Sequence, residues 1–597
     1  MLEGAPQLWG RKMQARVLIA GAFVCLFWMN VGVSAQKPGG ISEEVGSSAN
    51  PTQPAASRSG SSAAQTATPI PSVNQIIERL FKREAEEEEI IASYTPIVET
   101  YIQIEKSNSL KGTVPKSDLY FLGIADFRGK KMKVRPITGK THKGSIMWSF
   151  EPAGFLQMSF LDRGGFDKEH YIITSAGRSF LGDVRCYVFD VARTPKAKGP
   201  GFRGRIWVED QDFTIVRMNG SYAPEMDFSL RHFEDEFYLQ FDSWRTNMGP
   251  GLWLPSDIYT QDLREPPPTG GPRFKARTHL WGYGLTSRNR QEELGRLLVE
   301  TEGQVKDESG KQDRSPLDQQ RGWRELSGNN VMDILQRVGL VAPEGNVEKV
   351  LNTIVNNIMV TNGFDPGIEI KCRVLMTSDF ELFSMQNTIV MSRGLIDVVP
   401  NEETLAALLA FEIADAMVTK PAQDQYGFSD VLRLSPTEVL KKLSFIDKPE
   451  EARRNSEKAM ELLKKSPYGS KLSNAGLFLS QLQSQKPALK QLISARLGNE
   501  VYFTSQLLQM APALEPANLQ QLGALPMGSR IKINAWNDSV SLIETHQMGP
   551  LSPREKIPFE VTPIDLHLTR YVEPSAKLER STVPSTPIPV ATAVGPE

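Results

Sequence analysis

The sequence predicts an α+β protein of more than one domain, in which an antiparallel β domain precedes a mostly helical half with a small sheet. The chain has 597 residues, more than one hydrophobic core usually organises. From about residue 96 to residue 290, polar and apolar residues alternate in short runs that Gly, Pro and Asp interrupt, as in antiparallel strands. Beyond the charged stretch VKDESGKQDRSPLDQQR (305–321), apolar residues recur at helical spacing instead. This change of period divides the chain in two.

Composition and charge exclude several classes of protein. Hydrophobic residues make up 40% of the chain and charged residues 23%, and the formal net charge is -2. These values are typical of a globular protein, and no excess of positive charge draws the chain to nucleic acid or to an anionic membrane surface. We therefore expect no nucleic-acid partner.

The N-terminus carries the features of a signal peptide. Arg11, Lys12 and Arg16 precede the apolar run VLIAGAFVCLFWMNVGV, and small residues ending at Ala35 follow it. We expect cleavage after Ala35, which makes 1–35 a signal peptide and the mature protein periplasmic or secreted. The alternative is an uncleaved membrane anchor, for which a run of about 17 residues lies at the short end of the spanning range. After cleavage, no integral membrane segment is expected.

The remaining boundaries follow from composition. Residues 36–72 and 576–597 are rich in Ser, Ala, Pro and Gly or Thr and have few large apolar side chains, so both are predicted to be disordered. Between them we expect a β domain over 73–300 and a second domain over 329–575, joined by a polar linker over 301–328.

Cysteine content restricts how the mature chain can be stabilised. Only Cys186 and Cys372 remain after signal cleavage. Two cysteines so far apart cannot form a disulfide framework, so folding depends on apolar cores. The sequence leaves open whether these two residues pair.

The second domain shows its elements clearly. Apolar residues recur at i, i+3, i+4 and i+7 over 346–360, which predicts an amphipathic helix with Asn346 as its cap. The alternating segments IEIKCRVLM and NTIVMSRGLI predict two strands, and helices are expected to dominate 402–512.

The stretch TIVMSRGLIDVVPNEETLAALLAFEIADAMV, followed later by NEVYFTSQLLQMAP, resembles the zinc peptidases of the heat-shock protease HtpX and CAAX prenyl protease type, which are gluzincins. The resemblance covers about residues 330 to 550. In that family a strand and turn lead into a helix carrying His-Glu-x-x-His, and a later helix opens with a glutamate as the third zinc ligand. The resemblance places the first ligand on Phe411, the general base on Glu412, the second ligand on Asp415 and the third on Asn499.

These residues change the chemistry that the resemblance implies. A catalytic zinc needs three protein donors and an open water position, but Phe411 has no lone pair and Asn499 offers only a neutral amide. Without the metal, water keeps a pKa near ~15.7 instead of ~7, so Glu412 has nothing acidic enough to deprotonate. We therefore expect a pseudo-metallopeptidase with no metal and no cofactor, in which Glu412 is vestigial or structural. The alternative is an active metalloendopeptidase that holds zinc through atypical ligands.

The N-terminal run LGDVRCYVFDVARTPKAKGPGFRGRIWVEDQDFTIVRMNGSY resembles lipoprotein carriers of the LolA and LolB type. That resemblance implies a helix followed by an antiparallel half-barrel whose concave face holds acyl chains. Large rings in this half are compatible with a lipid cavity, although such rings also fill ordinary β cores, which is the first expectation for any one of them. They are Trp148, Phe150, Phe155, Phe160, Trp207, Trp244, Trp253 and Trp281.

Together these observations predict an exported cell-envelope protein that joins a carrier-like half-barrel to a degenerate peptidase domain and acts as a polypeptide or lipid binding module. Its expected partners are an envelope polypeptide or lipoprotein, or acyl chains. In the resembling peptidases an edge strand captures an extended peptide. The corresponding residues here are Thr388, Ile389, Val390 and Met391. A lipid or lipoprotein shuttle, with the second domain as scaffold, is the other reading.

Overall fold

The structure is a computed structural model. It describes residues 71–108, 112–129, 132–138, 155–197, 201–223, 239–262, 273–283, 328–364, 369–417, 444–500, 505–515, 517–528, 530–534, 536–542 and 559–572. The chain from Ile70 to Glu597 forms one compact unit. The predicted signal peptide and C-terminal tail lie outside the described residues, as does nearly all of both predicted linkers.

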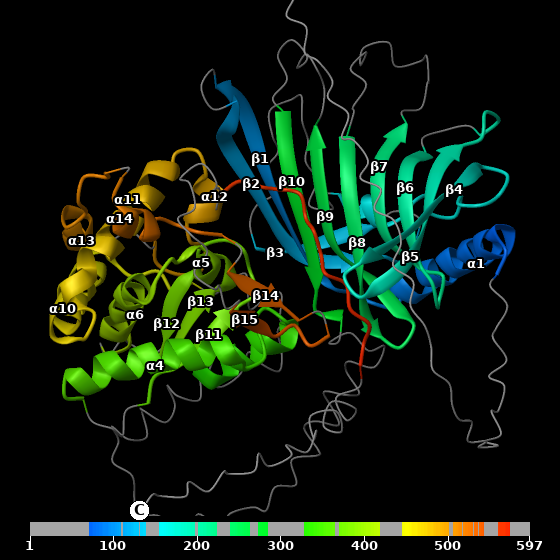
Figure 1. Ribbon diagram of the computed structural model, residues 1–597. Coiled ribbons are helices and arrows are strands. Elements are labelled where there is room, and N and C mark those ends of the chain that lie inside the picture. The colour runs from blue at the N-terminus through cyan, green and yellow to red at the C-terminus, as the bar shows by residue number, and fades with distance from the viewer. Residues whose placement is uncertain are drawn as a thin grey trace, which may run out of the picture. The chain divides into compact units, whose positions relative to one another are not determined.

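Ten antiparallel strands form one large sheet. They are β1 (Ile97–Asn108), β2 (Gly112–Asp126), β3 (Lys133–Thr138), β4 (Tyr171–Leu181), β5 (Val184–Arg193), β6 (Gly201–Glu209), β7 (Ile215–Ala223), β8 (Leu239–Gly249), β9 (Leu252–Asp262) and β10 (Arg273–Trp281). Their order is β3-β2-β1-β10-β9-β8-β7-β6-β5-β4 (Figure 1). Among the described strands, β3 and β4 end the sheet without pairing with each other, so the sheet is open. The predicted antiparallel sheet is confirmed.

A helix covers one face of this sheet, as predicted. Helix α1 (Val73–Ile91) begins at Ser72, whose hydroxyl accepts a hydrogen bond from the Gln75 amide at 3.3 Å, while the Gln75 side chain accepts one from the Ser72 amide at 2.9 Å. The helix buries Ile76, Leu80 and Ile91 in a hydrophobic cluster with the short helix η1 (Leu156–Ser159) and with alternate side chains of the strands. That face of the sheet is therefore a closed core.

The opposite face of the sheet shares a core with the C-terminal half. Trp244, Trp253 and Trp281 belong to the same cluster of buried side chains as the helices beyond residue 328. The indole N–H of Trp281 donates to the Gly339 carbonyl at 2.9 Å. Because apolar surface is buried jointly by both halves, neither half buries this core alone.

The C-terminal half is mostly helical. Its elements are α4 (Asn346–Thr361), β11 (Lys371–Leu375), β12 (Leu382–Met385), β13 (Thr388–Ser392), α5 (Arg393–Val398), α6 (Glu402–Met417), α10 (Pro449–Lys465), η3 (Gly469–Lys471), α11 (Leu472–Gln485), α12 (Lys490–Ile493), α13 (Ser505–Gln509), α14 (Leu519–Gly523), β14 (Ile531–Ile533) and β15 (Val540–Leu542). This confirms the predicted α+β class with a small sheet. None of the helices in the described ranges is long and apolar enough to cross a membrane.

The predicted amphipathic helix over 346–360 is confirmed as α4. Its start differs by one residue from the expectation, because the helix begins at Asn346 and Gly345 precedes it as the cap. The Gly345 amide donates to the Glu348 carboxylate at 2.8 Å, so the third residue of the helix supplies the cap that Asn346 was expected to give.

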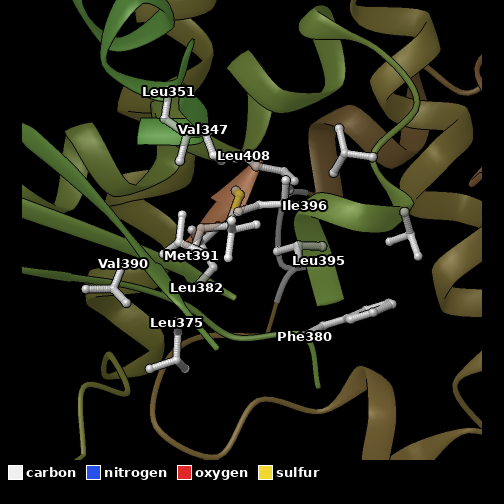
Figure 2. Close-up of a cluster of buried hydrophobic side chains, with 14 of the residues drawn as sticks. Val347, Leu351, Leu375, Phe380, Leu382, Val390, Met391, Leu395, Ile396 and Leu408 are labelled. Atoms are coloured by element: carbon white, nitrogen blue, oxygen red, sulfur yellow. The ribbon is translucent and has the colours of Figure 1, made fainter. Parts of the chain in front are cut away.

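The core of this half forms where α4, the small sheet, α5 and α6 meet. Figure 2 shows Leu351 of α4, Met391 of β13, Ile396 of α5 and Leu408 of α6 among the side chains gathered there. All four are buried. Dense packing of this kind fixes α6 firmly against the sheet.

Candidate functional site

Helix α6 is the element that the resemblance marks as catalytic. Glu402 and Glu403 lie in its first turn, where acidic side chains favour the helix dipole, and the Thr404 amide donates to the Asn401 side chain at 2.9 Å. Every residue from Thr404 to Asp415 is buried. A helix that is buried on all sides is a core helix, so this part of α6 lies inside the protein.

Two of the marked positions lie in this interior. Phe411 belongs to the hydrophobic core, and its side chain is 8% exposed. Glu412 is 0% exposed. A general base must reach a water molecule or a substrate, and the Glu412 side chain is shielded from solvent by the core.

The other two positions meet in one buried network of hydrogen bonds. The carboxylate of Asp415 accepts from the Ser384 hydroxyl and from the Asn455 amide, the latter at 2.7 Å. The same Asn455 amide donates to Asp447 at 3.0 Å. Asn499 donates to Asp447 at 3.1 Å and accepts from the Asp447 backbone amide at 2.8 Å. Asn455 and Asp447 therefore bridge the second and third ligand positions.

This network does not fit a zinc ion. A side-chain amide nitrogen has two hydrogens and no lone pair to offer, and Asn455 directs both hydrogens at the carboxylates that would have to be ligands. Zinc needs deprotonated or neutral donors with free lone pairs facing the metal. Within the ranges that the structure describes, no three His, Cys, Asp or Glu side chains are grouped so that they could hold a metal.

A neighbouring carboxylate positions the loop that carries Asn499. Glu381 accepts hydrogen bonds from the backbone amides of Arg496, Leu497 and Gly498. Burial and the nearby Asp379 raise the pKa of Glu381 to about 8. The backbone amide of Asn499 donates to the Leu382 carbonyl at 3.1 Å, which holds the network against β12.

Sequence reasoning missed Ser384, Asp447 and Asn455. One signal was available for Asn455, since it lies on the buried stripe of α10 with Ala459 and Leu462. A polar residue on such a stripe needs a partner in the core. The residue beside Asn499, Glu500, instead pairs with the Lys486 ammonium at 2.7 Å.

The predicted peptide-binding edge at Thr388, Ile389, Val390 and Met391 is wrong. The order of the small sheet is β11-β13-β12, so β13 is its central strand. It pairs in parallel with β11 and antiparallel with β12. Because both sides of the strand are paired, β13 has no free edge to offer a peptide.

The large rings of the β domain fill its cores. Trp244 and Trp253 are 0% exposed and Trp281 is 1% exposed. Phe155 and Phe160 are buried under α1 on the other face. Trp207 is partly buried beside the Arg217 guanidinium, which lies 4.6 Å from the centre of its ring. Trp148 and Phe150 lie outside the described residues. The rings that the structure describes are thus mainly core residues.

A segment near the C-terminus lies on the second face of the sheet. Residues 559–572, which we call the C-terminal strap, are drawn in red in front of the strands in Figure 1. Val561, Ile564 and Leu568 of the strap join the cluster that contains Trp244 and Trp253. The strap thus covers apolar surface that the sheet would otherwise expose.

Comparison with known proteins gives weak similarity to solved structures alone. No family model matches the sequence, and no curated protein matches it significantly. Among solved structures, the chain is similar to the crystal structure of a DUF1329 family protein from Desulfovibrio piger ATCC 29098. The two are 14% identical, the similarity covers 34% of this chain and 90% of that chain, and the TM-score is 0.19.

Proposed function

We propose that this protein is a non-catalytic polypeptide-binding protein of the cell envelope, in which a peptidase-like domain serves as scaffold for a large antiparallel sheet. The observation that carries the proposal is the hydrogen-bond network of Asp415, Asn455, Asp447 and Asn499. It includes Asp415 and Asn499, the two residues on which the sequence resemblance places the second and third metal ligands. Export and the envelope location rest on the basic and apolar pattern of residues 1–35.

The network supports the loss of catalysis for a chemical reason. Hydrolysis at neutral pH needs either an activated water or a nucleophile. The carboxylate oxygens of Asp415 and Asp447 accept hydrogen bonds from the Asn455 side-chain amide, and the Glu412 side chain is enclosed by the core. A buried network whose members satisfy one another stabilises the fold, and that is the role we assign to it.

A polypeptide is favoured over an acyl chain by the contacts that the sheet makes. Of the large rings singled out in the sequence that the structure describes, all but Trp207 are buried in the cores of the β half and do not line a cavity. The strap, by contrast, is a polypeptide segment whose main-chain amides already donate to side chains of the sheet. Binding of main-chain groups is how proteins capture extended peptides.

The test has a catalytic arm and a binding arm on the purified mature chain. The catalytic arm measures zinc by mass spectrometry after dialysis against zinc, and cleavage of unfolded casein with and without chelator. We expect far less than about one zinc per chain and no chelator-sensitive cleavage. About one zinc per chain together with such cleavage would overturn the proposal.

The binding arm measures fluorescence polarisation of a labelled, reduced and alkylated protein that cannot fold. We expect saturable binding that unlabelled unfolded protein competes away. The same titration with a fluorescent fatty acid is the comparison. Saturable uptake of the fatty acid without binding of the unfolded protein would favour the lipid shuttle instead.

A further inference from the structure

The strap has the alternation of an extended strand although it belongs to no sheet. Ile564 and Leu568 are buried and Leu566 is partly buried, whereas Asp565 and His567 between them are exposed. A period of two is the pattern of an extended chain with one face against a surface. The strap therefore lies on the sheet as a bound peptide would.

The sheet holds the main chain of the strap through two buried amide side chains. Gln103 of β1 donates to the Phe559 carbonyl and accepts from the Val561 amide at 2.8 Å. Asn247 of β8 accepts from the Tyr571 amide at 2.6 Å. Contacts to main-chain groups recognise an extended backbone whatever side chains it carries.

The middle of the strap passes over the turn between β4 and β5. The Asp183 amide donates to the Leu568 carbonyl at 2.8 Å. A Cβ on Gly182 would lie 2.6 Å from the Leu568 backbone nitrogen and oxygen, so only glycine leaves room for the strap. The turn is shaped to let a backbone approach closely.

Side chains add contacts at the C-terminal end of the strap. Arg570 pairs with Glu209 at 2.6 Å and with Asp210 at 3.2 Å, and its guanidinium lies 6.0 Å from the centre of the Trp253 ring. Glu209 is 0% exposed. The surface that the strap covers thus ends in a buried acidic group that pairs with a basic side chain.

We infer that the part of the sheet under the strap is a binding groove for an extended polypeptide, and that the strap is its built-in occupant. The polypeptide that fits this groove has apolar side chains at alternate positions and a basic residue near one end. This inference deepens the proposed function by naming the site and its regulation. A partner of the same chemistry binds when it displaces the strap.

Attachment to the chain explains why the groove is closed by default. A tethered occupant acts at an effective concentration of order millimolar. A free peptide with the same contacts must compete with that concentration, so its apparent affinity for the native protein is low. Anything that weakens the strap raises the affinity for the partner.

The test uses the full chain and a fluorescein-labelled synthetic peptide with the sequence FEVTPIDLHLTRYV. Ile564→Asp and Leu568→Asp together weaken the strap without touching the groove. We expect the labelled peptide to bind this double variant at least about 10-fold more tightly than it binds the native chain. Adding Gln103→Ala to the double variant should reduce the affinity again by roughly 10-fold, since a buried amide contact is lost.

Gln240→Ala in the same background is the matched control, because Gln240 is a glutamine of β8 that contacts Asn219 and no residue of the strap in the described contacts. It should leave binding unchanged. If the folded double variant binds the peptide no more tightly than the native chain, or if Gln103→Ala has no effect, the groove is overturned. Preferential binding of a fluorescent fatty acid to the double variant would also overturn it.

A second measurement tests the inference on the native chain, in case the double variant does not fold. Hydrogen exchange of the native chain is followed with and without a large excess of unlabelled peptide. Displacement predicts faster exchange over 559–572 with unchanged exchange in β8 to β10. Unchanged exchange of the strap under saturating peptide would overturn the inference. Zinc content and proteolysis are separate readouts, so failure of the groove leaves the non-catalytic proposal to be judged on its own.

Discussion

Arg393 and Glu99 form a buried ion pair of 2.7 Å between residues 294 positions apart in the sequence. Glu99 lies on β1 of the large sheet, and Arg393 opens helix α5 of the C-terminal half. The Glu99 carboxylate also accepts from the Ser378 amide at 2.7 Å and the Tyr120 hydroxyl at 2.6 Å. Burial opposes ionisation, but Arg393 with these hydrogen bonds holds the pKa of Glu99 below its ordinary value. The two halves are thus joined by charge as well as by the shared core.

The substitution Arg393→Met should destabilise the whole chain, because it leaves the Glu99 carboxylate buried without its cationic partner. Removal of one partner from a buried pair costs about 3 to 5 kcal/mol. Urea unfolding followed by circular dichroism measures this loss. Lys458→Ala is the control, since Lys458 and Glu461 form an exposed pair whose loss should cost under about 1 kcal/mol. Equal effects of the two variants would contradict this account.

Glu87 should make stability fall as pH rises through neutrality. Burial raises the pKa of its carboxyl to about 7, against 4.5 in the unfolded chain. Between these values the folded state keeps a proton that the unfolded state releases, so stability present below about pH 4.5 is lost as pH rises through about 7. At about 1.4 kcal/mol per pKa unit, the loss is of order 3 kcal/mol.

The variant Glu87→Gln should remove this slope and exceed the native chain in stability at about pH 8 by roughly 1 to 3 kcal/mol. The free energy of unfolding is measured for the variant and for the native chain from about pH 4.5 to 8, and the difference between them is the readout. The contributions of all other titrating groups are the same in both proteins and cancel in this difference. Glu86→Gln on the exposed side of α1 is the control. A difference that does not change with pH would show that Glu87 titrates normally.

Asn455→Ala should destabilise the C-terminal half without changing metal content. It removes the amide that donates to both Asp415 and Asp447. Each buried carboxylate loses one donor and keeps the other, from Ser384 or from Asn499, and the loss costs about 2 to 4 kcal/mol in all. Thermal unfolding and zinc analysis are measured together, with Asn356→Ala on the exposed side of α4 as the control. If loss of the amide instead allowed stoichiometric zinc to bind, the network would be protecting a latent metal site.

Gly394→Ala should be strongly destabilising, because a Cβ there would collide with the Ser378 backbone carbonyl. Overpacking against a backbone atom costs about 1 to 3 kcal/mol or more. Gly523→Ala is the comparison, since nothing lies within 4 Å of its Cβ position. It should be neutral or stabilising by up to about 1 kcal/mol. Chemical denaturation of the two variants gives the contrast, and equal stabilities would refute it.

The helices and strands could be predicted from the sequence more accurately than the contacts that they make with one another. Helix α4 and the strands of the large sheet follow from local periodicity, which short windows contain. The structure joins Asp415 and Asn499 through Asn455 and Asp447. Those bridging residues lie on other segments, so no local pattern connects them.

Strand order explains the error at β13. Alternation identifies a strand, but it does not say which neighbours pair with it. Here β12, which precedes β13 in the chain, and β11, which lies further back, take its two sides. The strap was missed because it has no regular secondary structure, and its alternation over 564–568 is too short to be distinguished from a loop.

The contact between Gln103 and the strap also sets an order of events in folding. The amide of Gln103 meets Val561, which lies 458 positions further along the chain. Strand β1 must likewise wait for β10 before its second edge is paired. Long loops must close before such contacts stabilise anything, and folds with high contact order form slowly. All ten strands of the sheet lie between Ile97 and Trp281, so the sheet can pair before the strap at 559–572 has been synthesised. The strap can cover the sheet only later, and the groove therefore closes after the sheet has formed.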